Sequence, residues 1–120
     1  MFFILFVLND MSLCDELLYA WEDAGVKGVT ILASTGLGRI RQNLALQEDF
    51  PIFPSLTNIS DFSENLSRTL FTIVENQETV DQLLKNTEKV VGSLQKPNTG
   101  ILIVLPAVNV YGLKSSHMEE

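Results

Sequence analysis

The feature that most constrains this fold is a pair of uninterrupted apolar runs near the two ends of the sequence, Phe2–Leu8 and Ile101–Leu105. A strand turns alternate side chains to opposite faces, so each run predicts a strand that is apolar on both faces. Both faces of such a strand have to be shielded from water. The rest of the chain, or a second chain, therefore has to provide two separate covers.

Two amphipathic helices are predicted between these runs. Asp10 or Ser12 can cap the first, Asp15 completes a weak capping box with Ser12, and Gly25 ends the helix. The apolar side of this helix recurs every three or four residues: Leu13, Leu17, Ala20, Trp21 and Ala24. Asn76 can cap the second helix, whose predicted buried side is Val80, Leu83, Leu84, Thr87, Val90, Val91 and Leu94.

Two further strands are predicted over Val29–Ser34 and Thr69–Val74, and a short extended piece over Val108–Tyr111. The order is then β-α-β, a long segment, and β-α-β. It predicts an α+β, ferredoxin-like βαββαβ fold with an antiparallel four-stranded sheet and two helices on one face. Residues 1–120 form one domain, with residues 114–120 expected to be a flexible tail.

Two helices can cover only one face of a four-stranded sheet. The other face would normally alternate with polar residues, yet both end runs are apolar on both sides. We therefore predict that the second face is buried against other copies and that the protein is an obligate oligomer.

Composition excludes several classes of partner and compartment. A net charge of −7 with eight Lys and Arg in all argues against nucleic-acid binding. Phe2–Leu8 is too short to span a bilayer and lacks basic and cleavage-site flanks, so we expect no membrane insertion and no signal peptide. The single cysteine, Cys14, suits a reducing cytoplasm.

The residues do not form a recognisable catalytic or metal-binding constellation, so we predict that the protein is not an enzyme and has no resident cofactor. The one histidine, His117, falls in the expected tail, and Cys14 has no basic neighbour in sequence. The spacing of Cys and His does not fit a zinc site. Trp21 lies at a helical core position, which is typical of packing.

The second strand leads into Gly36-Leu37-Gly38-Arg39, the most suggestive short segment. Its glycines allow a backbone to approach a ligand, and Arg39 can form paired bonds with phosphate or carboxylate. A flexible neck between the strand and the following segment is an equal alternative.

Residues 42–67 show no sustained periodicity, carry four acidic residues without Lys or Arg, and contain Phe50-Pro51-Ile52-Phe53-Pro54. Long loops of this kind usually carry function. We predict that Phe50, Ile52 and Phe53 dock on a target protein, the alternative being that this apolar patch folds back on the body.

Two stretches, residues 24–30 (AGVKGVT) and 36–39 (GLGR), resemble the P-II family of nitrogen regulatory signalling proteins. The resemblance implies a trimer with facing sheets, ATP or ADP bound between subunits, and a T-loop over 42–67 that engages targets. It implies effector-binding roles for Thr30, Gly36, Leu37, Gly38 and Arg39.

The sequence also departs from that family. Ile40 replaces the usual glutamine, residues 96–100 (KPNTG) replace a longer lysine-containing phosphate stretch, and residues 109–113 lack the family's arginines. Residues 42–67 contain no tyrosine that could be uridylylated. With fewer cations, the effector is expected to be smaller, less charged or only adenosine-like, and binding of ATP, ADP or AMP stays a hypothesis.

The sequence thus favours a non-catalytic, P-II-like regulator that binds an effector between subunits and acts through residues 42–67. Two alternatives remain at this point: a metal- or small-ligand-binding trimer of the copper-tolerance type, which would require metal ligands, and a small ferredoxin-like enzyme, which would require a polar pocket between sheet and helices.

Overall fold

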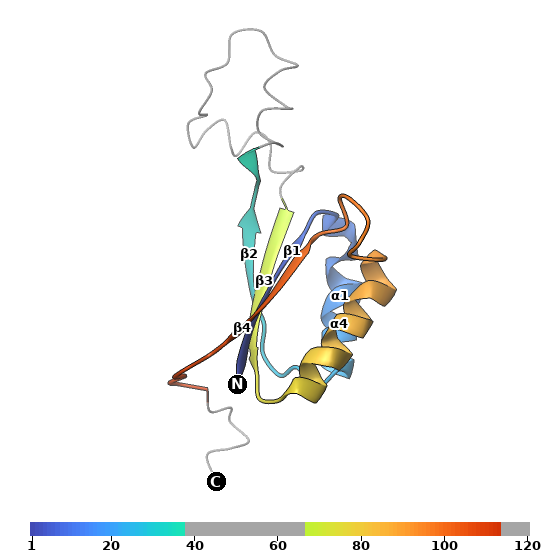
Figure 1. Cartoon of the computed structure of the whole chain (residues 1–120). Coiled ribbons are helices and arrows are strands. Elements are labelled where there is room, and N and C mark those ends of the chain that lie inside the picture. The colour runs from blue at the N-terminus through green and yellow to red at the C-terminus, as the bar shows by residue number, and fades with distance from the viewer. Residues whose placement is uncertain (38–66, 114–120) are drawn as a thin grey trace, which may run out of the picture.

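The computed structural model describes residues 1–37 and 67–113 of the chain. Along these residues the elements alternate as predicted from the sequence patterns (Figure 1). Their bounds are β1 Phe2–Leu8, the 3-10 turn η1 Met11–Leu13, α1 Cys14–Asp23, β2 Thr30–Ser34, β3 Ser67–Val74, α4 Gln77–Val91 and β4 Ile101–Pro106. No helix in this part of the chain is long and apolar enough to cross a membrane.

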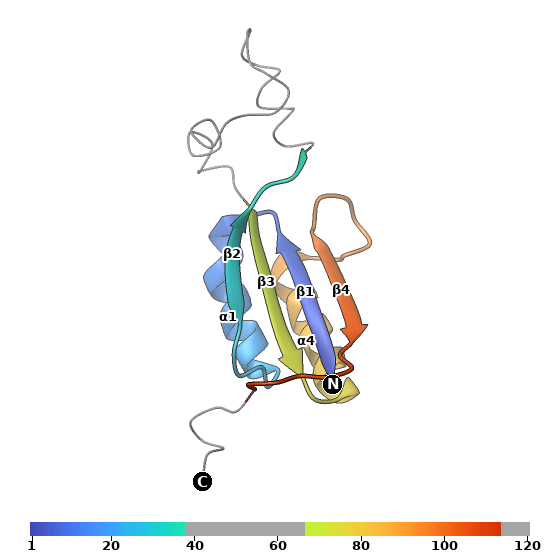
Figure 2. The same ribbon diagram turned by 90° about the vertical axis from the view of Figure 1, so that its left-hand side faces the viewer.

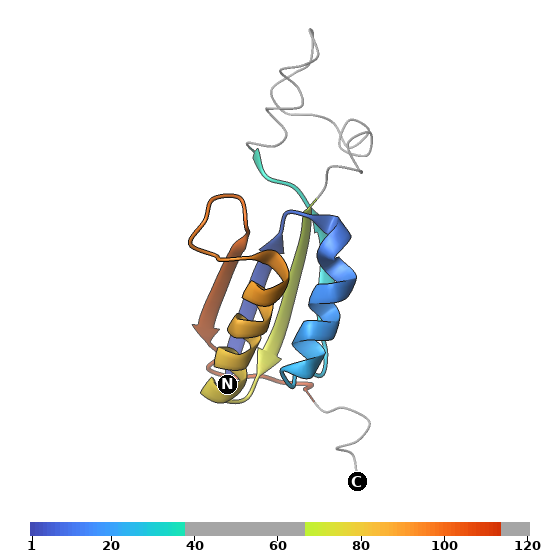
Figure 3. The same ribbon diagram turned by 90° about the vertical axis from the view of Figure 1, so that its right-hand side faces the viewer.

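The strands form one antiparallel sheet in the order β2-β3-β1-β4. Figure 2 shows this sheet from the side that carries no helix, and Figure 3 shows α1 and α4 lying together across the opposite side. This arrangement confirms the predicted α+β, ferredoxin-like fold. The two central strands, β3 and β1, come from different halves of the chain, so neither half forms the sheet alone.

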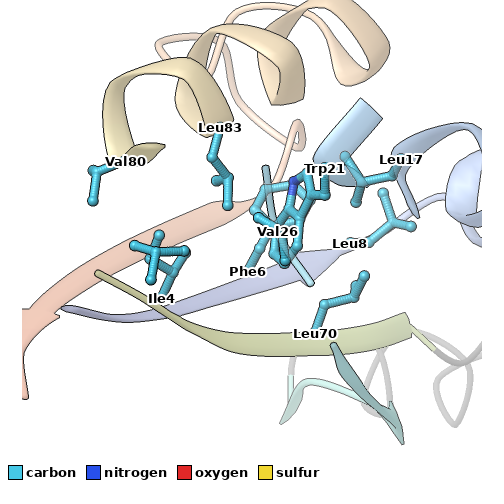
Figure 4. Close-up of a cluster of buried hydrophobic side chains, with 10 residues drawn as sticks. Ile4, Phe6, Leu8, Leu17, Trp21, Val26, Leu70, Val80 and Leu83 are labelled. Atoms are coloured by element: carbon cyan, nitrogen blue, oxygen red, sulfur yellow. The ribbon is translucent and has the colours of Figure 1, made fainter. Parts of the chain in front are cut away.

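The core lies between the sheet and the two helices (Figure 4). The sheet contributes Ile4, Phe6, Leu8 and Leu70, and the helices contribute Leu17, Trp21, Val80 and Leu83. Aliphatic and aromatic side chains removed from water on this scale supply the main driving force for folding.

Hydrogen bonds also tie the two helices to each other. The Trp21 indole Nε1 donates to the Thr87 hydroxyl at 2.8 Å, and the Asn86 amide nitrogen donates to the Ala20 carbonyl at 2.7 Å. Both Thr87 and Asn86 are buried. Their polar atoms are therefore satisfied inside the helix layer, which makes the contact between α1 and α4 specific as well as apolar.

The helix starts differ slightly from the predicted caps. Asp10 accepts from the Ser12 amide at 3.0 Å and the Ser12 hydroxyl at 2.6 Å, and so caps η1, whereas α1 begins after Leu13 with no side-chain cap. Asp10, rather than a Ser12–Asp15 capping box, therefore organises this turn. Asn76 caps α4 as predicted, because its side-chain oxygen accepts from the Thr79 amide at 2.9 Å.

Several boundaries and one buried position also differ from the sequence predictions. Pairing of Ser34 with Ser67 starts β3 two residues early, inside the segment expected to lack structure, and β2 starts one residue late. No strand is assigned to residues 108–111. Leu84 was predicted to be buried but is exposed, because α1 crosses α4 at Asn86 instead.

Candidate functional site

The sheet face that carries no helix has the most unusual surface in the described part of the chain. We call it the open face. Strand register places the same kind of apolar side chain on all four strands of this face: Phe3, Leu5, Val7, Leu32, Phe71, Ile73, Ile101, Ile103 and Leu105. The remaining positions are hydroxyl-bearing: Thr30, Ser34, Ser67 and Thr69. No charged residue stands on this face of the four strands.

Much of this apolar surface is accessible to water. Ile101 is 61% exposed and Leu105 51%, whereas Ile4 and Phe6 on the helix side of the same sheet are fully buried. Phe3 and Phe71 pack against each other with their ring centroids 5.6 Å apart, and the Ser34 and Thr69 hydroxyls are 2.8 Å apart. Contacts within the chain therefore organise the open face without covering it.

The size of the open face follows from strand geometry. Strand spacing and residue rise give an outline about 19 Å wide and about 20 Å long, or roughly 400 Å² before pleating is counted. The largest apolar patch on a soluble monomer is typically about 300–600 Å² and is often functional, so a patch of this order is a candidate interaction surface. The predicted need for a second cover on β1 and β4 therefore corresponds to a real surface in the structure.

The described members of the predicted effector site lie at the two ends of β2. Thr30 begins the strand, while Gly36 and Leu37 follow its far end; all three are exposed. The strand between them is about 13 Å long at its usual rise per residue. One chain therefore does not bring Thr30 together with Gly36 and Leu37. Gly38, Arg39, Phe50, Ile52 and Phe53 lie outside the described residues, as does the tail over 114–120.

A cavity of about 460 Å³ opens near the Thr30 end of β2. It is lined by the turn between α1 and β2, the end of β3, the start of α4 and the last described residue: Gly25, Lys27, Gly28, Thr72, Ile73, Val74, Glu75, Asn76, Thr79 and Leu113. The Thr72 hydroxyl donates to the Gly28 carbonyl, which ties this turn to β3. The polar lining is already partly engaged, and its charged members are one lysine and one glutamate.

Sequence reasoning did not find this cavity, because its lining comes from four separate segments. The one sequence signal for this cavity was the pair of glycines that follows α1, Gly25 and Gly28. Gly25 adopts φ +102°, a conformation that favours glycine, and the chain turns there from α1 toward β2. Such a turn leaves space at a sheet end, but nothing in the local sequence indicates which distant residues close it.

A second cavity, of about 420 Å³, lies at the other end of the molecule beside residues 96–99. Here Lys96 is the one cation in the lining and Asp10 the one anion. Hydrogen bonds from the Ser12 hydroxyl and amide hold the pKa of Asp10 below its ordinary value. The cavity therefore has no excess positive charge to bind a triphosphate.

Cys14 at the start of α1 does not have the environment of a reactive thiol. Partial burial, and then the nearby Asp15 carboxylate, raise its pKa, while Arg68 acts in the opposite direction more weakly. A raised pKa means that less thiolate is present at neutral pH. Within residues 1–37 and 67–113, no three His, Cys, Asp or Glu side chains are grouped to hold a metal.

In comparisons with known proteins, no family model matches the chain, and no curated protein matches it.

Proposed function

We propose that this protein is a non-catalytic regulator of the P-II-like type, which works as a homotrimer, binds a small effector between its subunits and acts on a target protein. The observation that carries the proposal is the open face. It is apolar on all four strands and free of charge, on a chain whose net charge is −7. Surfaces of this kind are typical of contacts between subunits.

The arrangement of the predicted effector residues supports a site between subunits. Thr30 stands on the open face at one end of β2, and Gly36 and Leu37 follow the other end. A small ligand does not bridge these two groups within one chain. When open faces pack together, the end of β2 in one copy can meet the opposite end in another, so that both groups contribute to one site.

The charges around the sheet favour a modest anion or a neutral ligand over a triphosphate. Lys96 faces Asp10 in one cavity, and Lys27 is accompanied by Glu75 in the other. Each cavity lining has equal numbers of positive and negative side chains. Adenosine, AMP or ADP fits this balance better than ATP, whose phosphates require several charge-assisted bonds.

The target-docking role is assigned to residues 42–67, with Phe50, Ile52 and Phe53 as the apolar contacts. The strands on either side of this segment are neighbours in the sheet, since Ser34 of β2 is opposite Ser67 of β3. A cytoplasmic location, where a lone cysteine stays reduced, completes the proposal.

Sedimentation velocity and calorimetry test the proposal together. We expect a trimer at micromolar concentration, and heat of binding with at least one of adenosine, AMP, ADP and ATP. Thr30→Ala should weaken that binding at least fivefold without changing the assembly, whereas Tyr19→Phe, which removes an exposed hydroxyl from α1, should leave it unchanged. A monomer would overturn the assembly, and no heat with any of the four ligands would overturn the adenine effector.

A further inference from the structure

The chain continues past β4 as an extended segment, residues 107–113, which we call the arm. It crosses the end of the sheet from the β4 side toward β2 (Figures 1 and 2). Its beginning is held by the Ala107 amide, which donates to the Met1 carbonyl at 3.0 Å. Its last residue, Leu113, lines the cavity beside Lys27 and Gly28. The arm is therefore held at its start, while Leu113 at its other end is 40% exposed.

The middle of the arm presents apolar side chains to water. Val108 is 91% exposed and Tyr111 89%, the highest values among the large apolar residues of the described chain. The arm contains no charged residue, with the sequence AVNVYGL. By comparison Tyr19, also highly exposed, stands on α1 among acidic residues. Val108 and Tyr111, in contrast, have no charged neighbour within the arm.

The arm lengthens the open face at the end where β4 finishes. Ile103 and Leu105 lead directly into it, and no charged residue stands between Leu105 and Leu113 in the sequence. The open face alone, at roughly 400 Å², has about half of the area that each partner contributes to a standard interface, roughly 800 Å². An exposed tyrosine and valine on a held segment can supply part of the difference, because aromatic anchors dominate binding energy.

Charge identifies a second copy of the chain as the occupant. Two copies that each carry a net charge of −7 repel each other wherever acidic surfaces meet. The acidic residues of the helices lie away from the open face: Asp15, Glu16, Glu22 and Asp23 on α1, and Glu78, Asp81 and Glu88 on α4. The open face and the arm together form the surface on which two such chains can approach without like charges meeting.

We propose that the arm of each copy clasps a neighbouring copy, with Val108 and Tyr111 buried against that copy at the edge of the packed open faces. This inference rests on the proposed assembly and adds to it the residues that hold the subunits together. The hydrogen bond from Ala107 to Met1 fixes where the arm leaves the sheet, so part of its position is set before association.

Sedimentation equilibrium of a Val108→Ser/Tyr111→Ser double variant tests this inference. Because both side chains are exposed in the single chain, the variant should keep its far-UV circular dichroism but associate at least tenfold more weakly. Tyr19→Ser is the matched control, since it removes another highly exposed tyrosine, from α1, and should leave association unchanged. Unchanged association in the double variant would overturn the role of the arm.

Two further measurements separate the arm from the open face. Ile103→Asp places a charge on the open face and should abolish association; if it does while the arm variant has no effect, the assembly stands and the clasp fails. A wild-type monomer would overturn both proposals.

Thiol labelling tests the burial of Val108 directly. In a Cys14→Ser background, a Val108→Cys thiol should react with a charged maleimide at least fivefold more slowly in the assembled protein than after dilution to the dissociated chain. Equal rates would contradict the clasp.

Discussion

The two faces of this sheet are built from almost the same side chains and end in opposite environments. On one face Ile4, Phe6 and Leu70 are sealed beneath α1 and α4; on the other Leu5, Ile103 and Leu105 have no cover within the described residues. Hydrophobicity therefore does not distinguish a core from an interface. The distinction comes from what the same chain can place over each face, and here two helices cover only one.

The largest expected difference between the faces concerns two phenylalanines of β1. Phe6→Ala removes a fully buried ring and should lower the free energy of unfolding by about 3–5 kcal/mol. Phe3→Ala, on the open face, should cost the single chain about 1 kcal/mol or less but weaken association. Urea unfolding at a fixed protein concentration measures the first effect and sedimentation the second. Equal losses of stability would mean that the open face is part of a core.

The covered face is also sensitive to added volume. A Cβ at Gly100 would lie 2.7 Å from the Phe6 ring and 2.7 Å from the Val7 carbonyl, and Gly100 has φ +129°. Gly100→Ala should therefore lower the free energy of unfolding by about 3 kcal/mol. In the arm, Gly112 has φ +85° with open space around it, so Gly112→Ala should cost only about 1 kcal/mol. Thermal or urea unfolding compares the two, and a smaller effect at Gly100 would contradict the close contact.

Removing one hydroxyl from the buried helix layer and one from the open face compares the two regions with a smaller change. Thr87→Val leaves the buried Trp21 indole without its acceptor and should cost about 2 kcal/mol. Thr69→Val breaks the hydroxyl pair with Ser34 on the open face, where Thr69 is only half-buried in the single chain, and should cost that single chain about 0.5 kcal/mol. Urea denaturation midpoints with unchanged slopes, measured at a protein concentration low enough to dissociate the assembly, would establish both values. The reverse order would show that the Thr69–Ser34 pair matters more to the fold than the buried Trp21–Thr87 hydrogen bond.

The smallest predicted effect is a pH dependence at the turn before α1. Hydrogen bonds from Ser12 lower the folded-state pKa of Asp10 below its ordinary value of 3.8, so this carboxylate stabilises the fold above that pH. The contribution is lost as the pH falls through the folded-state pKa. Asp10→Asn should therefore flatten the stability profile slightly between about pH 5 and about pH 2, measured by urea unfolding. An unchanged profile would show that Asp10 titrates normally.

The order of helices and strands was predictable because each of them has its own local pattern of apolar residues. The apolar runs predicted β1 and β4, and the periodic stripes predicted α1 and α4. Which α4 residues are buried depends on where α1 crosses this helix, and the local pattern does not predict that crossing. Leu84 and Asn86 are close together on α4, and the leucine is the better hydrophobe, yet Asn86 is buried because it meets the Ala20 carbonyl of α1.

Of the candidate site, the sequence predicted only that one face of the sheet is apolar and must be covered by another chain. Two-sided apolar strands indicated an exposed sheet face, and strand register then defined its members. The 460 Å³ cavity, whose lining comes from several segments, and the two exposed side chains of the arm depend on how the chain closes at the end of the sheet. The short extended piece predicted over Val108–Tyr111 lies in the arm, where it is not assigned as a strand.

The pairing of Ser34 with Ser67 has a consequence for how this protein can change. Whatever lies between them starts and finishes on adjacent strands, as a hairpin turn does. Its replacement by a tight two-residue turn would leave the register of β2 and β3 intact and reduce the entropy cost of closing the loop. The residues between Ser34 and Ser67 can therefore be replaced by other sequences while the sheet stays the same, so that the same fold could acquire new recognition properties.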